Sequence, residues 1–149
     1  MSLFDNVFEG DSSFAPRAFG PQEGFAGVLL AASACDGHIA SEEVQSLVTI
    51  LIRMKMYQYV PPHKFNSMLD RLLGVLKRGG PAQLVQMSVP AVPPELRETV
   101  FANACDIVLA DGVVEPDEKA FMDDLMFKLE LGHDRAKDIV QVIIYKNQG

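Results

Sequence analysis

From residue 21 onward, apolar residues recur every three or four positions, which is the spacing of one face of an α-helix. A clear example follows Ser41, a residue type common at helix N-caps, with apolar positions at Val44, Leu47, Val48 and Leu51. No segment shows the alternation that a half-buried strand requires. The sequence therefore predicts an all-α protein.

Prolines and glycines divide this pattern into pieces of helix length. A proline fits the first turn of a helix, and a glycine fits the position just after its end. Placing the boundaries accordingly gives about seven helices. They are expected from Gln22 to Cys35, from Ser41, from Pro62 to Gly79, from Ala82 to Ser88, from Pro94 to Asp111, from Pro116 to Gly132, and from about Asp134.

The first twenty residues have a different character, because they mix phenylalanine with Gly, Ser, Pro and Asp and show no sustained period. We expect residues 1–20 to form a flexible N-terminal arm and residues 21–149 to form a single helical domain. The arm carries four phenylalanines that dock either on the chain's own surface or on a partner. They are Phe4, Phe8, Phe14 and Phe19.

Charge and cysteine content exclude several classes of protein. A formal net charge of −7 works against binding to a phosphate backbone, so nucleic acid is not an expected partner. Cys35 and Cys105 form no CxxC motif, and no secretory signal is recognisable, which favours a reducing, cytoplasmic environment. The longest apolar stretch, from Phe25 to Cys35, is shorter than the roughly 20 residues of a membrane span and predicts a buried helix.

An eight-residue pattern, Asp-Gly-x-[Ile/Val]-x-x-x-Glu, occurs twice, and its two copies span residues 36–43 and 111–118. The offset of 75 residues indicates an internal repeat, and thus two pseudo-symmetric halves. The helices that follow the two copies are expected to share their apolar phase. The offset places Leu47 opposite Met122, Ile50 opposite Leu125, and Leu51 opposite Met126.

Each copy places an Asp in a turn and a Glu in the first turn of the next helix. If the halves pack about a twofold axis, then Asp36, Glu43, Asp111 and Glu118 converge, and neighbouring carboxylates favour a bound cation. Oxygen ligands suit Ca²⁺, Mg²⁺ or Mn²⁺. The alternative is that these carboxylates only cap helices and turns, as acidic residues commonly do.

The pattern also matches the second part of an EF-hand loop, but the first part is wrong for calcium. Apolar residues occupy the first and third ligand positions of both copies, where Asp or Asn is required. A self-contained calcium loop is therefore excluded, and a metal site would have to be shared between the copies. The apolar residues are Ala32 and Ala34 in one copy and Ile107 and Leu109 in the other.

With these two copies, the segment from Gly24 to Lys146 resembles the tellurite-resistance TerB-like family, whose members are all-helical and repeat an Ala-Asp-Gly-[hydrophobic]-x-x-x-Glu motif. The chain departs from that motif at Cys35, which replaces its first alanine. The resemblance implies a TerB-like fold over residues 21–149 and a role in stress response at the inner face of a membrane. It also implies metal binding through Asp36, Glu43, Asp111 and Glu118.

The sequence contains no recognisable set of nucleophile, acid and base, so a non-enzymatic function is expected. Three hypotheses remain. The first is a stress-response domain that binds a divalent ion, the second is a helical adaptor without metal, and the third is a carboxylate-bridged metal hydrolase. Protein partners are expected under the first two, while homodimer formation and peripheral membrane association stay open.

Overall fold

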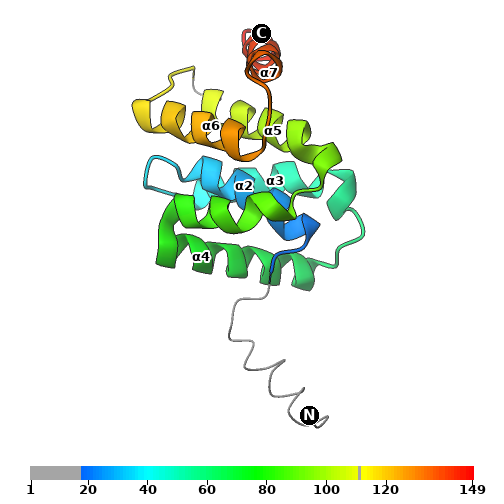
Figure 1. Ribbon diagram of the computed structural model, residues 1–149. Coiled ribbons are helices and arrows are strands. Elements are labelled where there is room, and N and C mark those ends of the chain that lie inside the picture. The colour runs from blue at the N-terminus through cyan, green and yellow to red at the C-terminus, as the bar shows by residue number, and fades with distance from the viewer. Residues whose placement is uncertain (1–17, 111) are drawn as a thin grey trace, which may run out of the picture.

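The computed structural model describes residues 18–110 and 112–149, and within these residues it is all-helical, without a strand. Three short 3-10 helices accompany the α-helices: η1 (Lys55–Tyr57), η2 (Val89–Ala91) and η3 (Pro94–Leu96). The described chain has six α-helices (Figure 1). They are α2 (Pro21–Ser33), α3 (Ser41–Ile52), α4 (Pro62–Ser88), α5 (Arg97–Leu109), α6 (Pro116–Lys128) and α7 (His133–Lys146).

The expectation of about seven helices is not confirmed, because the two helices predicted on either side of Gly79 and Gly80 form one element, α4. The helical geometry is interrupted at Gly80, where φ is 78° and ψ is 178°. A glycine adopts this positive φ without a steric penalty. Pro81 follows it inside the helix and lacks the N–H of a regular helical bond. Element α4 therefore consists of two helical segments, residues 62–79 and 81–88, which meet at the break that the sequence predicts (Figure 1).

Helix α2 lies at the centre of the domain, with α4 on one side and α5 on the other (Figure 1). Every residue from Gly24 to Ala32 is buried. A helix that is apolar on all sides has to be covered on all sides. The prediction of a buried helix in this stretch is thus confirmed, and α3, α4 and α5 all pack against it.

Small residues allow α2 and α4 to approach closely. A Cβ atom added to Gly27 would lie 2.1 Å from Ser88 Oγ, and one added to Gly24 would lie 2.8 Å from the Ser88 carbonyl oxygen. Ser88 itself is fully buried, and its hydroxyl has no hydrogen-bond partner among the described residues. The absence of side chains at Gly24 and Gly27 therefore sets the distance between the two helices.

Of the expected N-terminal arm, residues 1–17 lie outside the described residues, together with Phe4, Phe8 and Phe14. Phe19 is buried, and the guanidinium carbon of Arg71 lies 4.8 Å from the centre of its ring. Arg71 also forms an ion pair with Glu23 in the first turn of α2. Phe19 thus docks on the chain's own surface at the start of α2.

The two acidic turns have similar local structure. Gly37 and Gly112 both adopt positive φ, of 94° and 77°, which explains the glycine of the repeated pattern. The next helices begin at equivalent positions, Ser41 and Pro116. Ser41 is the first residue of α3 and not its N-cap as expected, since the cap position is held by Ala40 in extended geometry.

The predicted common apolar phase of the following helices is not confirmed in detail. Leu47 and Leu51 are the buried residues of α3, whereas Leu125 is the buried residue of α6. Met122 and Met126, which the offset places opposite Leu47 and Leu51, are only partly buried. The most buried positions of α6 thus differ from those of α3, although all six compared positions are buried or partly buried. Helix α3 packs on α2, whereas α6 packs on α5.

We expect Gly27→Ala to lower the free energy of unfolding by about 1–3 kcal/mol, because the new Cβ has to push Ser88 out of a packed helix contact. Gly74→Ala is the matched control, since it makes the same exchange inside a helix where the new Cβ meets only the flexible end of Arg78. That control should gain about 0.5–1 kcal/mol from helix propensity. Urea unfolding measures both, and equal effects would contradict the close α2–α4 contact.

Candidate functional site

The first acidic turn connects α2 to α3 and uses its aspartate locally. The Oδ1 atom of Asp36 accepts a hydrogen bond of 3.0 Å from the backbone N–H of His38. This is the Asx turn that an Asp at this position commonly makes. His38, the histidine nearest to the predicted metal ligands, is exposed. Glu43 is also exposed and lies in the first turn of α3, where a negative charge interacts favourably with the helix dipole.

In the second acidic turn the glutamate caps its own helix. The Oε1 atom of Glu118 accepts a hydrogen bond of 2.9 Å from the backbone N–H of Glu115, which is the N-cap of α6. This contact belongs to a capping box, and it satisfies a donor that the helix leaves unpaired. Asp111, the remaining predicted ligand, lies outside the described residues. Asp36 and Glu118 therefore perform the capping roles that the alternative interpretation assigns to them.

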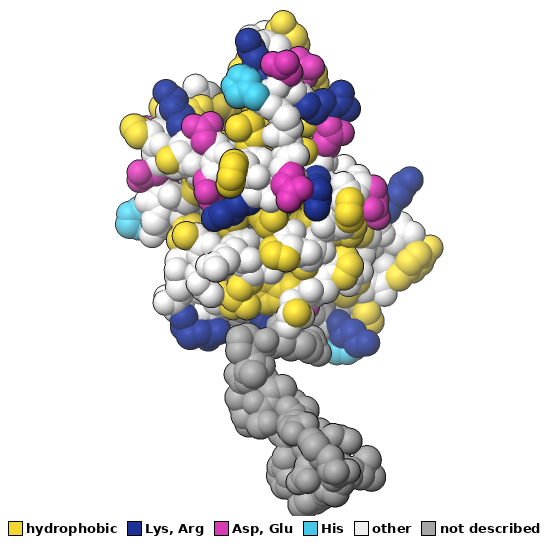
Figure 2. All heavy atoms as spheres, in the orientation of Figure 1, with side chains coloured by type: hydrophobic (Ala, Val, Ile, Leu, Met, Phe, Trp, Pro, Cys, Tyr) yellow, Lys and Arg dark blue, Asp and Glu magenta, His cyan; other side chains and the backbone are white. Residues whose placement is uncertain are grey.

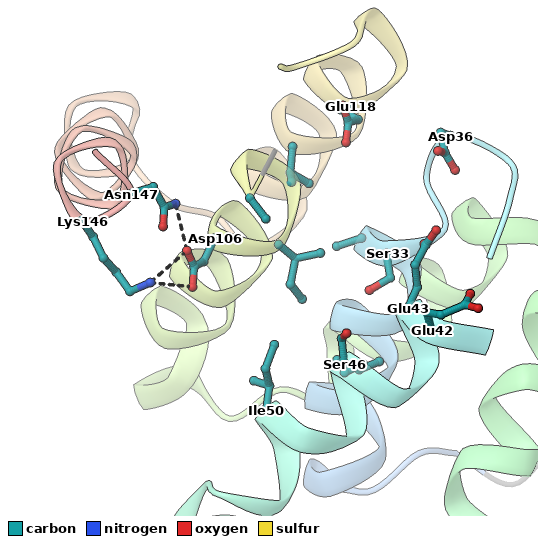
Figure 3. A pocket seen from close by; sticks show the side chains of 15 residues that line it. Ser33, Asp36, Glu42, Glu43, Ser46, Ile50, Asp106, Glu118, Lys146 and Asn147 are labelled. Carbon is teal, nitrogen blue, oxygen red and sulfur yellow. Dashed lines mark hydrogen bonds and ion pairs between the residues drawn. The ribbon is translucent and has the colours of Figure 1, made fainter. Parts of the chain in front are cut away.

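An open cavity of about 550 Å³ lies between α3 and α5, and we call it the α3–α5 groove (Figure 3). Its wall on one side is α3, its opposite wall is α5 with the ends of α6 and α7, and the end of α2 lies at its base. The groove has an apolar part and a polar rim. The apolar residues are Ala32, Leu47, Ile50, Ile107, Val108 and Ala110, and the polar residues are Ser33, Asp36, Glu42, Glu43, Ser46, Asp106, Glu118, Lys146 and Asn147.

The structure brings three of the four predicted site residues to this groove. Asp36, Glu43 and Glu118 all line it, and in Figure 3 Glu118 faces Asp36 and Glu43 across its opening. In the part of the chain that the structure describes, however, no three His, Cys, Asp or Glu side chains are grouped closely enough to hold a metal ion. The described carboxylates share one cavity but do not share one point.

The pKa of the Cys35 thiol is affected by carboxylates from both acidic turns. Burial, together with the nearby negative charges of Glu118 and Asp36, raises its pKa to about 11. Burial also raises the pKa of Cys105 to about 11, with a smaller effect from Asp106. Both thiols are therefore protonated near neutral pH and are weak nucleophiles. Cys35 is therefore influenced by carboxylates of both acidic turns, Asp36 of the first and Glu118 of the second.

At the opposite end of the groove, α7 is tied to α5 by contacts that the sequence analysis missed. Lys146 Nζ donates to both carboxylate oxygens of Asp106 at 3.2 and 3.1 Å, and Asn147 Nδ2 donates to Asp106 Oδ1 at 3.0 Å (Figure 3). One available signal was the isolated carboxylate of Asp106 between apolar neighbours. Its partners are about 40 residues away, and no local pattern identifies them.

Charge is unevenly distributed over the molecule. On the face shown in Figure 2, Asp and Glu side chains lie over the upper half, interspersed with Lys and Arg side chains, and the lower edge carries Lys and Arg. The segment from Arg53 to Arg78 holds six of the chain's 13 Lys and Arg residues and a single acidic residue, Asp70. The segment from residue 53 to residue 78 is therefore the basic part of the chain, and it supplies no lining residue to the α3–α5 groove.

Comparison with known proteins gives no relative: no family model, no curated protein and no solved structure matches the chain. The resemblance to the TerB-like family thus depends on the two acidic turns alone. Within the described residues, no helix is both long enough and apolar enough to cross a membrane. The lining of the α3–α5 groove is therefore the basis for a function.

Proposed function

We propose that this protein is a non-enzymatic helical interaction domain that binds a segment of a partner protein in the α3–α5 groove. The observation that carries the proposal is the combination of an apolar interior and a carboxylate rim in one open cavity of about 550 Å³. Protein-binding surfaces commonly have this composition, with an apolar centre and a polar periphery.

The apolar part of the groove supplies the affinity in this proposal. Ile50 on α3 and Ile107 on α5 both line the groove, and both are only partly buried by the domain. Covering such residues with a partner removes apolar surface from water, which stabilises a complex by about 25 cal/mol per Å² before the cost of association. The rim carboxylates then select the partner by charge.

The biological setting that we propose is a stress-response system of the tellurite-resistance type. It rests on the two copies of the acidic turn, at residues 36–43 and 111–118, and on the all-helical fold. In such a domain the duplicated turns hold the starts of α3 and α6 beside the groove. They would serve as a rigid frame for the binding surface.

We expect Ile50→Asp to abolish partner binding, because it places a charge in the apolar part of the groove. The protein would be immobilised as bait for a lysate of its source cells, and bound proteins would be quantified by mass spectrometry. At least one protein should be captured roughly tenfold less by the variant, as for a residue at the centre of an interface.

Ile52→Asp provides the matched control, since Ile52 lies on the same helix, is exposed, and does not line the groove. Circular dichroism and thermal unfolding would establish that both variants are folded. Equal capture profiles for the parent, Ile50→Asp and Ile52→Asp would contradict the proposed function.

A divalent ion between the acidic turns is the second candidate. The observation in its favour is that Asp36, Glu43 and Glu118 line one cavity, while Asp36 and Glu118 both raise the pKa of Cys35. The described carboxylates do not complete a metal site by themselves, so this candidate requires Asp111. The hydrolase hypothesis would require a second ion as well, and no feature of the groove favours it.

The second candidate predicts that one of Ca²⁺, Mg²⁺ or Mn²⁺ raises the Tm of EDTA-treated protein, because an ion bound only by the folded state stabilises it. The double variant Asp36→Asn/Asp111→Asn should lose that increase. Thermal unfolding with each ion, and with Zn²⁺ as a softer comparison, measures both. If no ion raises the Tm of the parent protein, the divalent-ion hypothesis is wrong.

A further inference from the structure

The α3–α5 groove lies between two helices and could accept a third one. Its two walls are helices, and both supply a partly exposed apolar residue, Ile50 on α3 and Ile107 on α5, while Leu47 and Val108, which also line it, are buried. Helices in proteins pack with their axes about 8–10 Å apart through such apolar stripes. An amphipathic helix that places its apolar face in a groove is a common mode of recognition.

The two ends of the groove differ in charge. Asp36, Glu42, Glu43 and Glu118 lie at the end where α3 and α6 begin, and no Lys or Arg among the described residues forms an ion pair with them. At the other end, the carboxylate of Asp106 is neutralised by Lys146. The uncompensated negative charge is therefore concentrated at one end (Figure 3).

We infer that the partner segment is a cationic amphipathic helix that lies in the α3–α5 groove with its N-terminal end at the acidic end. This inference rests on the proposed function and specifies its partner. Lysine or arginine side chains complement these four carboxylates, which form no ion pair within the described part of the chain. The N-terminus of the helix adds the positive end of its dipole, equivalent to about half an elementary charge. Leucine-like residues three and four positions apart fill the apolar part.

The test uses synthetic, fluorescein-labelled peptides of about 16 residues, long enough to form a helix on the protein surface. All have leucines on one helical face. The first carries lysines in its N-terminal half and glutamines in its C-terminal half, the second has the same composition with the halves exchanged, and the third has glutamate in place of lysine. Fluorescence anisotropy at low ionic strength gives the Kd of each, since salt screens the expected attraction.

We expect both lysine peptides to bind, and the first about twofold more tightly than the second, because the attraction of the acidic end to the helix N-terminus is partly offset by repulsion between that terminus and the peptide's own lysines. The third should not bind measurably. Glu42→Gln/Glu43→Gln should weaken the first peptide by about tenfold, because it removes two of the four charges at the acidic end. The matched control Asp123→Asn/Asp124→Asn makes the same change of net charge on exposed positions of α6 outside the groove and should leave the Kd unchanged.

Equal binding of the first and third peptides, equal effects of the two double variants, or no binding by any peptide would overturn the inference. So would self-association of the protein that Ile50→Asp abolishes, because it would assign the groove to a second copy of the chain. The proposed function fails separately, when Ile50→Asp leaves capture from the lysate unchanged. If Ile50→Asp abolishes capture but Glu42→Gln/Glu43→Gln leaves the Kd of the first peptide unchanged, the proposed function stands and the cationic partner does not.

Discussion

The arrangement of this domain depends on the burial of α2 from every side. Its buried run from Gly24 to Ala32 can be covered only if other helices pack around it, and α3, α4 and α5 do so. The closest of these contacts is with α4, where Gly24 and Gly27 leave the space that the backbone and side chain of Ser88 occupy. An apolar helix without such small residues would hold its neighbours further away and leave voids in the core.

The groove follows from this centre. Helix α3 uses Leu47 and Leu51 to pack on α2, and α5 uses Val100, Phe101 and Ala104 in its own buried face. Ile50 and Ile107, which are not needed for these contacts, remain partly exposed between the two helices. The acidic turns sit at the starts of α3 and α6, so their charges border the groove at one end. Local capping by Asp36 and Glu118 and a shared acidic rim are therefore compatible, since a capping carboxylate keeps its charge.

Much of the fold could be predicted from local signals. The proline at the start of α6, the positive φ of the glycines in both turns and the burial of α2 all follow from the chemistry of single residues or short periods. Features that depend on distant segments could not be predicted. Leu125 is buried more deeply than Ile50, its counterpart in the repeat, and Met126 is buried less deeply than Leu51. The Asp106–Lys146 ion pair joins residues with no common motif. The predicted carboxylates reach one cavity, yet their separation there depends on how the helices pack.

The central claim is that the surface between α3 and α5 receives a partner segment. It is tested most directly by NMR of protein labelled at its isoleucine methyl groups, titrated with the peptide that carries N-terminal lysines. The account predicts that the methyl signals of Ile50 and Ile107 shift in parallel with binding, while those of Ile52 and Ile144, which are exposed outside the groove, do not. Shifts confined to Ile52 or Ile144, with Ile50 and Ile107 unchanged at saturation, would contradict it.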